Sequence, residues 1–545
     1  MRQADLSYAG GVSELPLLGD TIGLQLERTT AEHGDRDALV DVPSGRRWSY
    51  AALNADVDRL AAGLLRLGIE KGDRVGIWAP NVPEWVLVQY ATAKIGAILV
   101  NINPAYRSSE LRFVLEQSGI RTLISAAQHR TSDYVTLIAE VRPEVPTLLD
   151  VLIIGSPEWN ALAGGAEDPD AVASRLEALD RDDPINIQYT SGTTGFPKGA
   201  TLSHHNILNN GYLVTQTQRF THEDRLCVQV PFYHCFGMVM GNLGTMAHGG
   251  CVVIPAPAFD AAATMKAIQQ ERCTALYGVP TMYIAILDHP DFGQHDFSSL
   301  RTGIMSGSPC PVEVMKRVID AMHMPEITIS YGMTETSPVS THTSIDSSVE
   351  QRTSTVGTVH PHVEIKIVDP GSGATVPVGA TGELCARGYL VMRDYWNDPK
   401  KTAEVIDDAR WMHTGDLATM DEDGYFAIVG RLKDMVIRGG ENVYPREIEE
   451  FLYSHPDIAD VQVVGIPDPK YGEELCAWIR MREGREPITA ASLREFCAGR
   501  LARYKIPRYV HLADDFPMTV TGKIRKREMR ERTTELLGLR ADTKG

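Results

Sequence analysis

The sequence has no long uninterrupted apolar run, and its N-terminus has no basic region followed by an apolar one. A membrane-spanning helix needs about 20 consecutive apolar residues, and a secretory leader needs a charged region before a shorter apolar one. We therefore expect no transmembrane segment and a cytoplasmic protein.

Basic residues and paired cysteines are also scarce. The 545 residues include 53 Lys and Arg against 71 Asp and Glu, a formal charge of −18. This balance argues against a nucleic-acid-binding surface. The 8 cysteines are scattered, with no C-x-x-C pair, which favours reduced, packed thiols over a disulfide framework or a zinc site.

What the sequence does contain is an alternation of strand-like and helical segments. Residues 74–79 and 97–101 are strand-like, and the apolar spacing between them predicts a helix over 85–95. Such alternation is typical of α/β proteins with mostly parallel sheets covered by helices. Shorter strand-like runs with Gly and Pro turns begin near Val356 and indicate a β-rich subdomain.

A domain boundary is predicted at residues 430–434, which read GRLKD. The remaining residues, with a helix that begins at Pro445, have the strands and helices of a small α+β unit of ordinary domain size. We therefore predict a large N-terminal domain over residues 1–430, a hinge over 431–435 and a small C-terminal domain over 436–545.

A small-residue loop at 189–199 reads YTSGTTGFPKG and separates a short apolar run from a periodic segment that Ser203 is placed to cap. Glycines let a backbone approach phosphates closely, and hydroxyls and amides point at the oxygens. Lys198 would add positive charge. The P-loop pattern of kinases fails because Pro197 precedes this lysine and Gly199 follows it. A plain surface loop is the alternative interpretation.

Four further strings carry candidate chemistry. Residues 330–336 read SYGMTET, and Thr334 with Glu335 could bind phosphate oxygens and Mg²⁺. Residues 411–417 read WMHTGDL and present an Asp that could accept ribose hydroxyls. The others are GRLKDMVIRGGENVYP at 430–445 and FPMTVTGKIR at 516–525. Each alone is explained nearly as well by an exposed turn or a solvated charge.

Together, in this order, the five strings resemble those of the adenylate-forming (AMP-binding) superfamily, which includes acyl-CoA synthetases. The resemblance implies an ATP site whose α-phosphate is bridged to the substrate carboxylate by Lys523. It assigns the metal to Glu335 and the ribose to Asp416 with Arg431. The ATP-binding residues implied are Thr190, Ser191, Gly192, Thr193, Thr194, Gly195, Phe196, Pro197, Lys198, Gly307, Ser308, Tyr331, Gly332, Met333, Thr334, Asp416, Arg431 and Lys523. The catalytic residues implied are Lys523, Lys198, Thr194 and His234.

The same resemblance implies a two-step reaction with ATP, Mg²⁺ and coenzyme A. A carboxylate first forms an acyl-adenylate with release of pyrophosphate, and CoA then displaces AMP. Between the steps the small, mobile domain turns about Lys433. The resemblance also assigns Gly439 and Gly440 to CoA binding, since glycines let the backbone approach the thin arm of this substrate closely.

The acid is predicted from two segments. By the same resemblance, the segment 231–237 has His234 at the position where acyl-CoA synthetases carry an aromatic gate residue beside the acyl pocket. This segment contains no acidic residue, which disfavours an amino acid substrate. Acetate-activating relatives carry a bulky Trp where Gly332 stands, so we expect open space here and a medium- or long-chain fatty acid.

The alternatives are an aryl-CoA ligase, an acyl-AMP ligase that loads a carrier protein, a luciferase-like oxidation and an ATP-binding scaffold. Fatty acid, ATP and CoA are the expected partners, without nucleic acid, and a homodimer is compatible with the sequence.

Overall fold

The computed structural model describes residues 5–190, 197–308, 310–439, 441–518 and 524–539. The chain divides into two compact units. The large unit comprises Ala9–Ile365 and Ala386–His413, and the small unit comprises Met1–Tyr8, Lys366–Cys385 and Thr414–Gly545.

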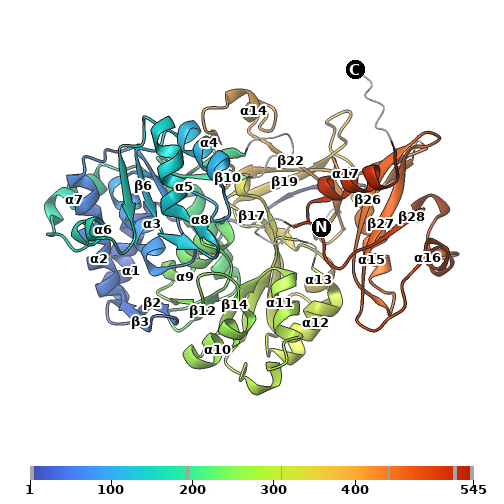
Figure 1. Cartoon of the computed structure of the whole chain (residues 1–545), viewed down its shortest axis with the longest axis horizontal. Helices are drawn as coiled ribbons and strands as arrows, with labels where there is room; N and C mark the ends of the chain where they lie inside the picture. Colours follow the sequence, from blue (N-terminus) through green and yellow to red (C-terminus); the bar gives the residue numbers. More distant parts are fainter. Residues whose placement is uncertain (1–4, 191–196, 309, 440, 519–523, 540–545) are drawn as a thin grey trace. The chain divides into compact units, whose positions relative to one another are not determined.

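Two sheets of mostly parallel strands form the centre of the large unit (Figure 1). Within the described ranges, one sheet has the order β21 (Asp394–Tyr395), β11 (Lys198–Ser203), β10 (Pro184–Thr190), β5 (Ile98–Asn101), β4 (Arg74–Trp78), β6 (Thr122–Ser125) and β9 (Asp150–Ile153). The other has the order β18 (Thr358–Val359), β17 (Val339–His342), β16 (Glu326–Gly332), β15 (Thr302–Met305), β14 (Ala275–Gly278), β12 (Arg225–Val228), β13 (Cys251–Ile254), β2 (Asp37–Asp41) and β3 (Arg46–Ser49). A short ribbon pairs β7 (Gln128–His129) with β8 (Ser132–Asp133).

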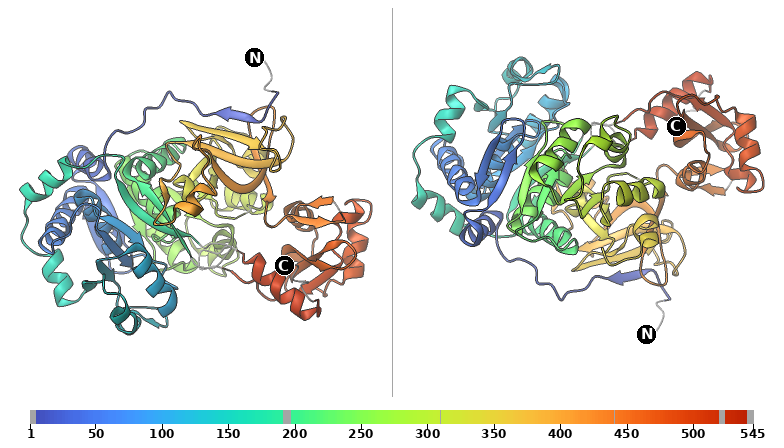
Figure 2. Two further views of the ribbon diagram at one scale, coloured as in Figure 1. Left: turned by 90° about the horizontal axis from the view of Figure 1, so that it is seen from above. Right: turned by 90° about the horizontal axis from the view of Figure 1, so that it is seen from below.

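Helices cover both faces of these sheets (Figure 2). On the second sheet, the Tyr283 hydroxyl of α11 donates to the backbone of β14 and β15, and the Tyr277 ring of β14 stacks on Phe236 of η2 from the opposite face. The helices of the large unit are α1 (Ile22–His33), α2 (Tyr50–Arg66), α3 (Pro83–Ile95), α4 (Ser108–Ser118), α5 (Tyr134–Val141), η1 (Arg142–Glu144), α6 (Pro157–Ala163), α7 (Pro169–Glu177), α8 (His204–Thr217), η2 (Phe236–Leu243), α9 (Gly244–Ala247), α10 (Ala261–Glu271), α11 (Pro280–Leu287), η3 (Phe292–Gln294), α12 (Val312–Ala321), η4 (Thr334–Thr336), α13 (Val349–Ser354) and α14 (Pro399–Ala403). The predicted layered α/β architecture is confirmed.

A third sheet has the order β1 (Tyr8–Gly10), β19 (Val363–Val368), β20 (Gly382–Gly388), β22 (Met412–Met420) and β23 (Phe426–Arg431). The boundary between the units passes through its strands. Its position in the sequence confirms the β-rich subdomain predicted to begin near Val356.

The C-terminal residues build a separate sheet with its own hydrophobic core. Its order is β25 (Glu441–Val443), β24 (Val436–Arg438), β27 (Gly472–Met481) and β26 (Ile458–Asp468), and β28 (Tyr509–Leu512) pairs with β27. The helices are α15 (Pro445–Leu452), α16 (Ala490–Cys497), η5 (Arg503–Lys505) and α17 (Lys526–Leu536). The small unit also contains residues 414–435, so the predicted boundary at 430 and the hinge at 431–435 stay predictions.

No helix within the described residues is long and apolar enough to cross a membrane. All eight cysteines are buried and none forms a disulfide, as the scattered spacing predicted.

Candidate active site

The described ends of the predicted phosphate-binding string belong to two paired strands. Strand β10 pairs antiparallel with β11, with Tyr189 opposite Gly199 and Thr190 opposite Lys198. The sequence predicted a strand, a loop and then a helix, but a second strand precedes α8. This second strand is β11. It forms because its backbone amides and carbonyls find hydrogen-bond partners in β10 on one side and β21 on the other. The predicted helix cap is confirmed, since the Ser203 hydroxyl accepts a hydrogen bond from the Asn206 amide at 3.1 Å.

The predicted metal ligand lies beside the first strand of this hairpin. The Glu335 carboxylate, on η4, is 5% exposed. Its Oε1 accepts a hydrogen bond at 3.4 Å from the hydroxyl of Thr190, the last residue of β10. A second hydroxyl, from Tyr395 of β21, donates to the same oxygen at 2.7 Å. The structure thus brings residues of three distant segments together around one carboxylate.

Lys198 belongs to the same group of side chains. Its ammonium lies 4.9 Å from the centre of the Tyr395 ring, a cation–π arrangement. Burial raises the pKa of Tyr395 far above its usual value, and the adjacent Glu335 carboxylate raises it further. The phenol therefore keeps its proton and acts as a donor to Glu335 at any physiological pH.

This geometry fits a bound divalent cation. No Lys, Arg or His of the described ranges lies within ion-pair distance of Glu335. A buried carboxylate without a cation is costly, and its oxygens are the ligands that Mg²⁺ prefers. A metal that arrives with a polyphosphate would offset that cost.

Two of the predicted ATP-binding residues, Gly307 and Tyr331, lie at the carboxyl ends of adjacent parallel strands, β15 and β16. Gly307 follows β15 and has φ +91, a conformation that favours glycine. The Ser306 hydroxyl donates to the Ser330 carbonyl of β16 at 2.6 Å, which ties this loop to the strand that ends in Tyr331 and Gly332. Ligands of open parallel sheets bind at this edge.

The predicted gate residue begins a buried segment. The Nδ1 atom of His234 accepts a hydrogen bond at 3.1 Å from the amide of Phe236, which is the first residue of the π-helical η2. The next residue, Cys235, lies 3.5 Å from the Thr334 hydroxyl. The segments 231–237 and 330–336 therefore meet, and π-helical turns are frequent at functional sites.

The predicted ribose pair is formed within the small unit. Asp416 of β22 lies opposite Arg431 of β23 in the strand register. Their side chains approach to 3.1 Å between Nε and Oδ1, with the carboxylate 9% and the guanidinium 59% exposed. Lys433 follows in the turn between β23 and β24, where Asp434 and Met435 both donate to the Arg431 carbonyl. Their roles toward ribose and as a hinge stay predictions.

The predicted CoA-side glycine is anchored in the same unit. Gly439 has φ +63, and its amide donates to the Tyr471 carbonyl at 2.8 Å. Beside it, Arg438 makes a two-point ion pair with the fully buried Glu474, at 2.5 and 2.8 Å. Strand β24, which ends one residue before this glycine, is thereby tied to β27.

Comparison with known families decides the identity. Residues 26–396 match the family described as AMP-binding enzyme, and residues 447–523 match the AMP-binding enzyme C-terminal domain. The chain belongs to the AMP-binding enzymes. The resemblance inferred from the five strings is confirmed.

This AMP-binding enzyme has full-length relatives. It is 48% identical to "Putative acyl-CoA synthetase YngI" of Bacillus subtilis, over 96% of this chain and 99% of the relative. It is 44% identical to the mitochondrial medium-chain acyl-CoA ligase ACSF2 of Danio rerio, over 98% of this chain and 91% of the relative. The solved structure of ATP-bound MatB from Rhodopseudomonas palustris superimposes with a TM-score of 0.85 at 29% identity, over 95% of this chain and 100% of that chain.

Several predicted site residues of this AMP-binding enzyme lie outside the described residues. They are Ser191, Gly192, Thr193, Thr194, Gly195, Phe196, Gly440 and Lys523. Their roles stay predictions that rest on the sequence strings.

The open space expected at Gly332 is absent. A Cβ added there would lie 1.7 Å from the Pro338 carbonyl oxygen and 3.0 Å from the Ser340 amide nitrogen. The crowding is backbone against backbone, where β16 and β17 pair with an irregular register at this glycine. Glycine stands here because the neighbouring strand leaves no room for a side chain, so the residue gives no information on chain length.

We therefore expect Gly332→Ala to lower the adenylation rate for acetate, hexanoate and decanoate by the same factor. Overpacking that costs about 1–3 kcal/mol at the site corresponds to a loss of about fivefold to a hundredfold in rate. The measurement is kcat/KM for each acid, with Gly293→Ala as the control, since a Cβ at Gly293 would meet nothing within 4 Å. A loss confined to decanoate would instead make position 332 part of the acyl pocket.

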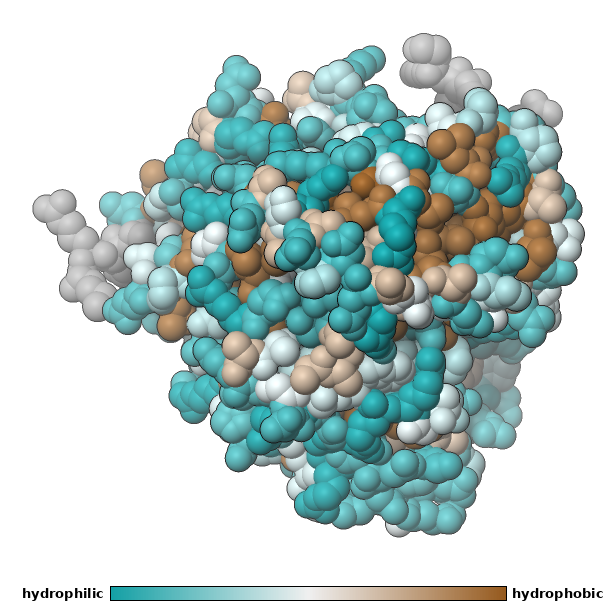
Figure 3. Space-filling view, turned by 90° about the vertical axis from the view of Figure 1, so that its left-hand side faces the viewer, coloured by the Kyte–Doolittle hydropathy of each residue, from teal (hydrophilic) through white to brown (hydrophobic). Residues whose placement is uncertain are grey.

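An apolar hollow of about 640 Å³ lies elsewhere in the large unit, at the edge strand β9. It is lined by Val135, Ile138, Ala139, Arg142, Pro143, Val145, Pro146, Leu148, Val151 and Ile153. Figure 3 shows a face of the molecule on which hydrophobic residues gather. The hollow has one charged lining residue, Arg142, and none of the predicted site residues, so it does not suit a nucleotide.

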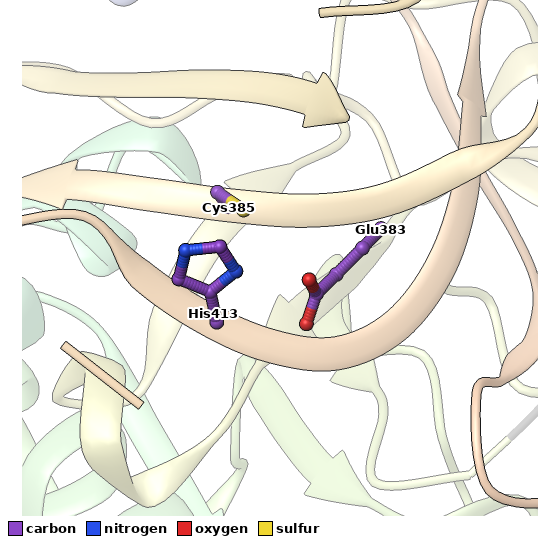
Figure 4. A group of neighbouring side chains, drawn as sticks. All are labelled: Glu383, Cys385 and His413. Atoms are coloured by element: carbon purple, nitrogen blue, oxygen red, sulfur yellow. The ribbon is translucent and has the colours of Figure 1, made fainter. Parts of the chain in front are cut away.

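A further group of metal-ligating side chains involves the third sheet. Figure 4 shows Glu383 and Cys385 of β20 with His413 of β22, whose ligand atoms lie within 4.8 Å of one another. A thiol and an imidazole are poor ligands for Mg²⁺, and a structural zinc site needs four ligands. The group lacks Glu335, so it is separate from the predicted metal site.

Sequence reasoning missed Tyr395 as a site residue. It is 60 positions from Glu335 in the sequence, and it stands in a segment, DYWNDP, with no pattern that suggests phosphate or metal chemistry. Only the pairing of β21 with β11 brings its side chain to the site.

Proposed function

We propose that this AMP-binding enzyme is an acyl-CoA ligase that activates a medium-chain fatty acid through an acyl-adenylate. The observation that carries the proposal is the buried Glu335, which has no ion-pair partner among the described residues and lies beside the described ends of the phosphate loop, Thr190 and Lys198. A carboxylate, a lysine and a glycine-rich loop suit a metal-bound triphosphate. By class the protein is an AMP-forming acid–thiol ligase, which agrees with relatives named as acyl-CoA ligases.

In the first half-reaction an oxygen of the fatty acid carboxylate attacks the α-phosphorus of ATP, and the bond to pyrophosphate breaks. The protein contributes position and charge, as in other attacks on phosphorus. Lys198 would neutralise phosphate oxygens, and Glu335 would hold Mg²⁺, which would supply positive charge to the polyphosphate. Asp416 and Arg431 hold the ribose. Lys523 bridges the carboxylate and the α-phosphate.

In the second half-reaction the CoA thiol, after losing its proton, attacks the acyl carbonyl carbon. A carbon–sulfur bond forms, and the carbon–oxygen bond to AMP breaks. We propose that rotation about Lys433 first withdraws Lys523 and then brings Gly439 and Gly440 to the CoA arm. Gly439 already has the positive φ that lets a backbone approach a thin chain closely.

The choice of a fatty acid rests on the chemistry of the gate segment and on the relatives. No acidic residue in 231–237 is placed to hold a substrate amino group. The zebrafish relative is named a medium-chain acyl-CoA ligase, which favours the middle of the chain-length range over long chains and over aromatic acids. A cytoplasmic location and a homodimer stay parts of the proposal, and the zebrafish relative is named mitochondrial.

The proposal predicts that activity rises steeply with chain length. Each methylene buried in an apolar pocket contributes about 0.8 kcal/mol, or roughly a factor of four in kcat/KM. We expect the rise to continue from acetate to about octanoate and then to level off. The measurement is CoA-dependent AMP release for even-numbered acids, with benzoate and 4-coumarate in parallel and CoA omitted as the control. A higher kcat/KM for an aromatic acid would favour the aryl-CoA ligase instead.

A further inference from the structure

Among the contacts described above, Tyr395 is the buried side chain that contacts both the Glu335 carboxylate and the Lys198 ammonium. Its hydroxyl donates to Glu335 Oε1 at 2.7 Å, and its ring faces the Lys198 ammonium at 4.9 Å. All three residues belong to the large unit.

The backbone holds this tyrosine firmly. Strand β21 pairs with β11 with Tyr395 opposite Ala200, two residues beyond Lys198. The Tyr395 amide donates to the Thr402 hydroxyl at 2.9 Å, and its carbonyl accepts from the Asp398 amide at 3.0 Å. The phenol is therefore presented to Glu335 from a fixed position, so it restricts where the carboxylate can lie.

We infer that Tyr395 is a positioning residue of the adenylation site: its hydroxyl orients Glu335 for the metal of Mg·ATP, and its ring places Lys198 against the phosphates. This inference rests on the proposed function. The two roles are separable, because the hydroxyl acts only through the carboxylate and the ring acts only through the ammonium. If the hydroxyl acts by orienting the metal ligand Glu335, then its removal should weaken ATP binding only when the metal is present.

Two substitutions separate the roles. Tyr395→Phe keeps the ring and removes the hydroxyl, while Tyr395→Leu removes both. Binding of α,β-methylene-ATP, whose bridge between the α- and β-phosphorus is not cleaved and which therefore cannot adenylate the acid, is measured by calorimetry with excess Mg²⁺ and again with EDTA. Hydrogen bonds to charged groups contribute enough to predict about a tenfold or larger loss of affinity. We expect Tyr395→Phe to show this loss only with Mg²⁺, and Tyr395→Leu to lose affinity in both conditions.

A matched control is Tyr389→Phe. This tyrosine is also buried in the large unit, and its hydroxyl accepts from Asn210 at 3.3 Å, but it contacts neither Glu335 nor Lys198 among the described contacts. We expect its affinity for the analogue to equal that of the wild type in both conditions. In the background of Glu335→Gln, the effect of Tyr395→Phe is expected to shrink to less than about threefold, since interacting residues are not additive.

Equal Mg²⁺-dependent affinity of Tyr395→Phe and the wild type would overturn the inference. So would an equal loss with and without Mg²⁺, which would indicate a structural role. Both outcomes leave the proposed function intact, because the wild type would still bind the analogue with Mg²⁺. A wild type that fails to bind it would overturn the proposed function and this inference together.

Discussion

Lys523→Ala is expected to remove acyl-adenylate formation while sparing thioester formation from synthetic acyl-AMP. Negative charge between the carboxylate and the α-phosphate develops only in the first half-reaction, and one such electrostatic contact typically accounts for about a hundred- to a thousandfold in rate. The measurements are octanoate-dependent pyrophosphate release and, separately, CoA thioester formation from octanoyl-AMP.

The control for this prediction is Lys526→Ala. Lys526 is a nearby lysine whose ammonium is paired with the buried Glu449 at 2.6 Å, so it tests for a general effect of removing a lysine from this part of the chain. A similar fall of both half-reactions in Lys523→Ala would contradict the role given to Lys523.

Lys433→Pro is expected to spare acyl-adenylate formation and to slow thioester formation. Proline fixes the backbone angle φ, and a hinge residue has to change its torsions between the two half-reactions. Pyrophosphate release in the first turnover is expected to stay within about threefold of the wild type, whereas CoA-dependent turnover falls by about a hundredfold. Rapid-quench measurements separate the two rates.

Lys433→Ala serves as the matched control, because it removes the ammonium but leaves the backbone torsion φ able to rotate. We expect CoA-dependent turnover in this variant to stay close to that of the wild type. If Lys433→Pro turned over at the wild-type rate, residue 433 would not be the hinge.

The sequence strings assigned Asp416 and Arg431 to one ribose site, and the structure places the two residues opposite each other on the adjacent strands β22 and β23. The layered α/β fold was also predictable, since buried strands and amphipathic helices leave apolar runs of different period. The side chains of Asp416 and Arg431 approach to 3.1 Å, and their role toward ribose stays a prediction.

Three features were not predictable, each because it depends on tertiary contacts. Strand β11 exists because β10 and β21 flank it, whereas its sequence resembles the end of a loop. Gly332 is needed because the Pro338 backbone folds against it. Tyr395 reaches Glu335 across 60 positions of sequence, and no local pattern marks such a contact.

The most direct test of the central claim is a single-turnover experiment with octanoate and radiolabelled ATP, followed by rapid quenching. The account predicts that octanoyl-AMP and pyrophosphate form together in the absence of CoA. On addition of CoA, octanoyl-AMP should decay at the rate at which octanoyl-CoA and AMP appear. Formation of octanoyl-CoA without a preceding octanoyl-AMP, or release of ADP in place of AMP, would contradict it.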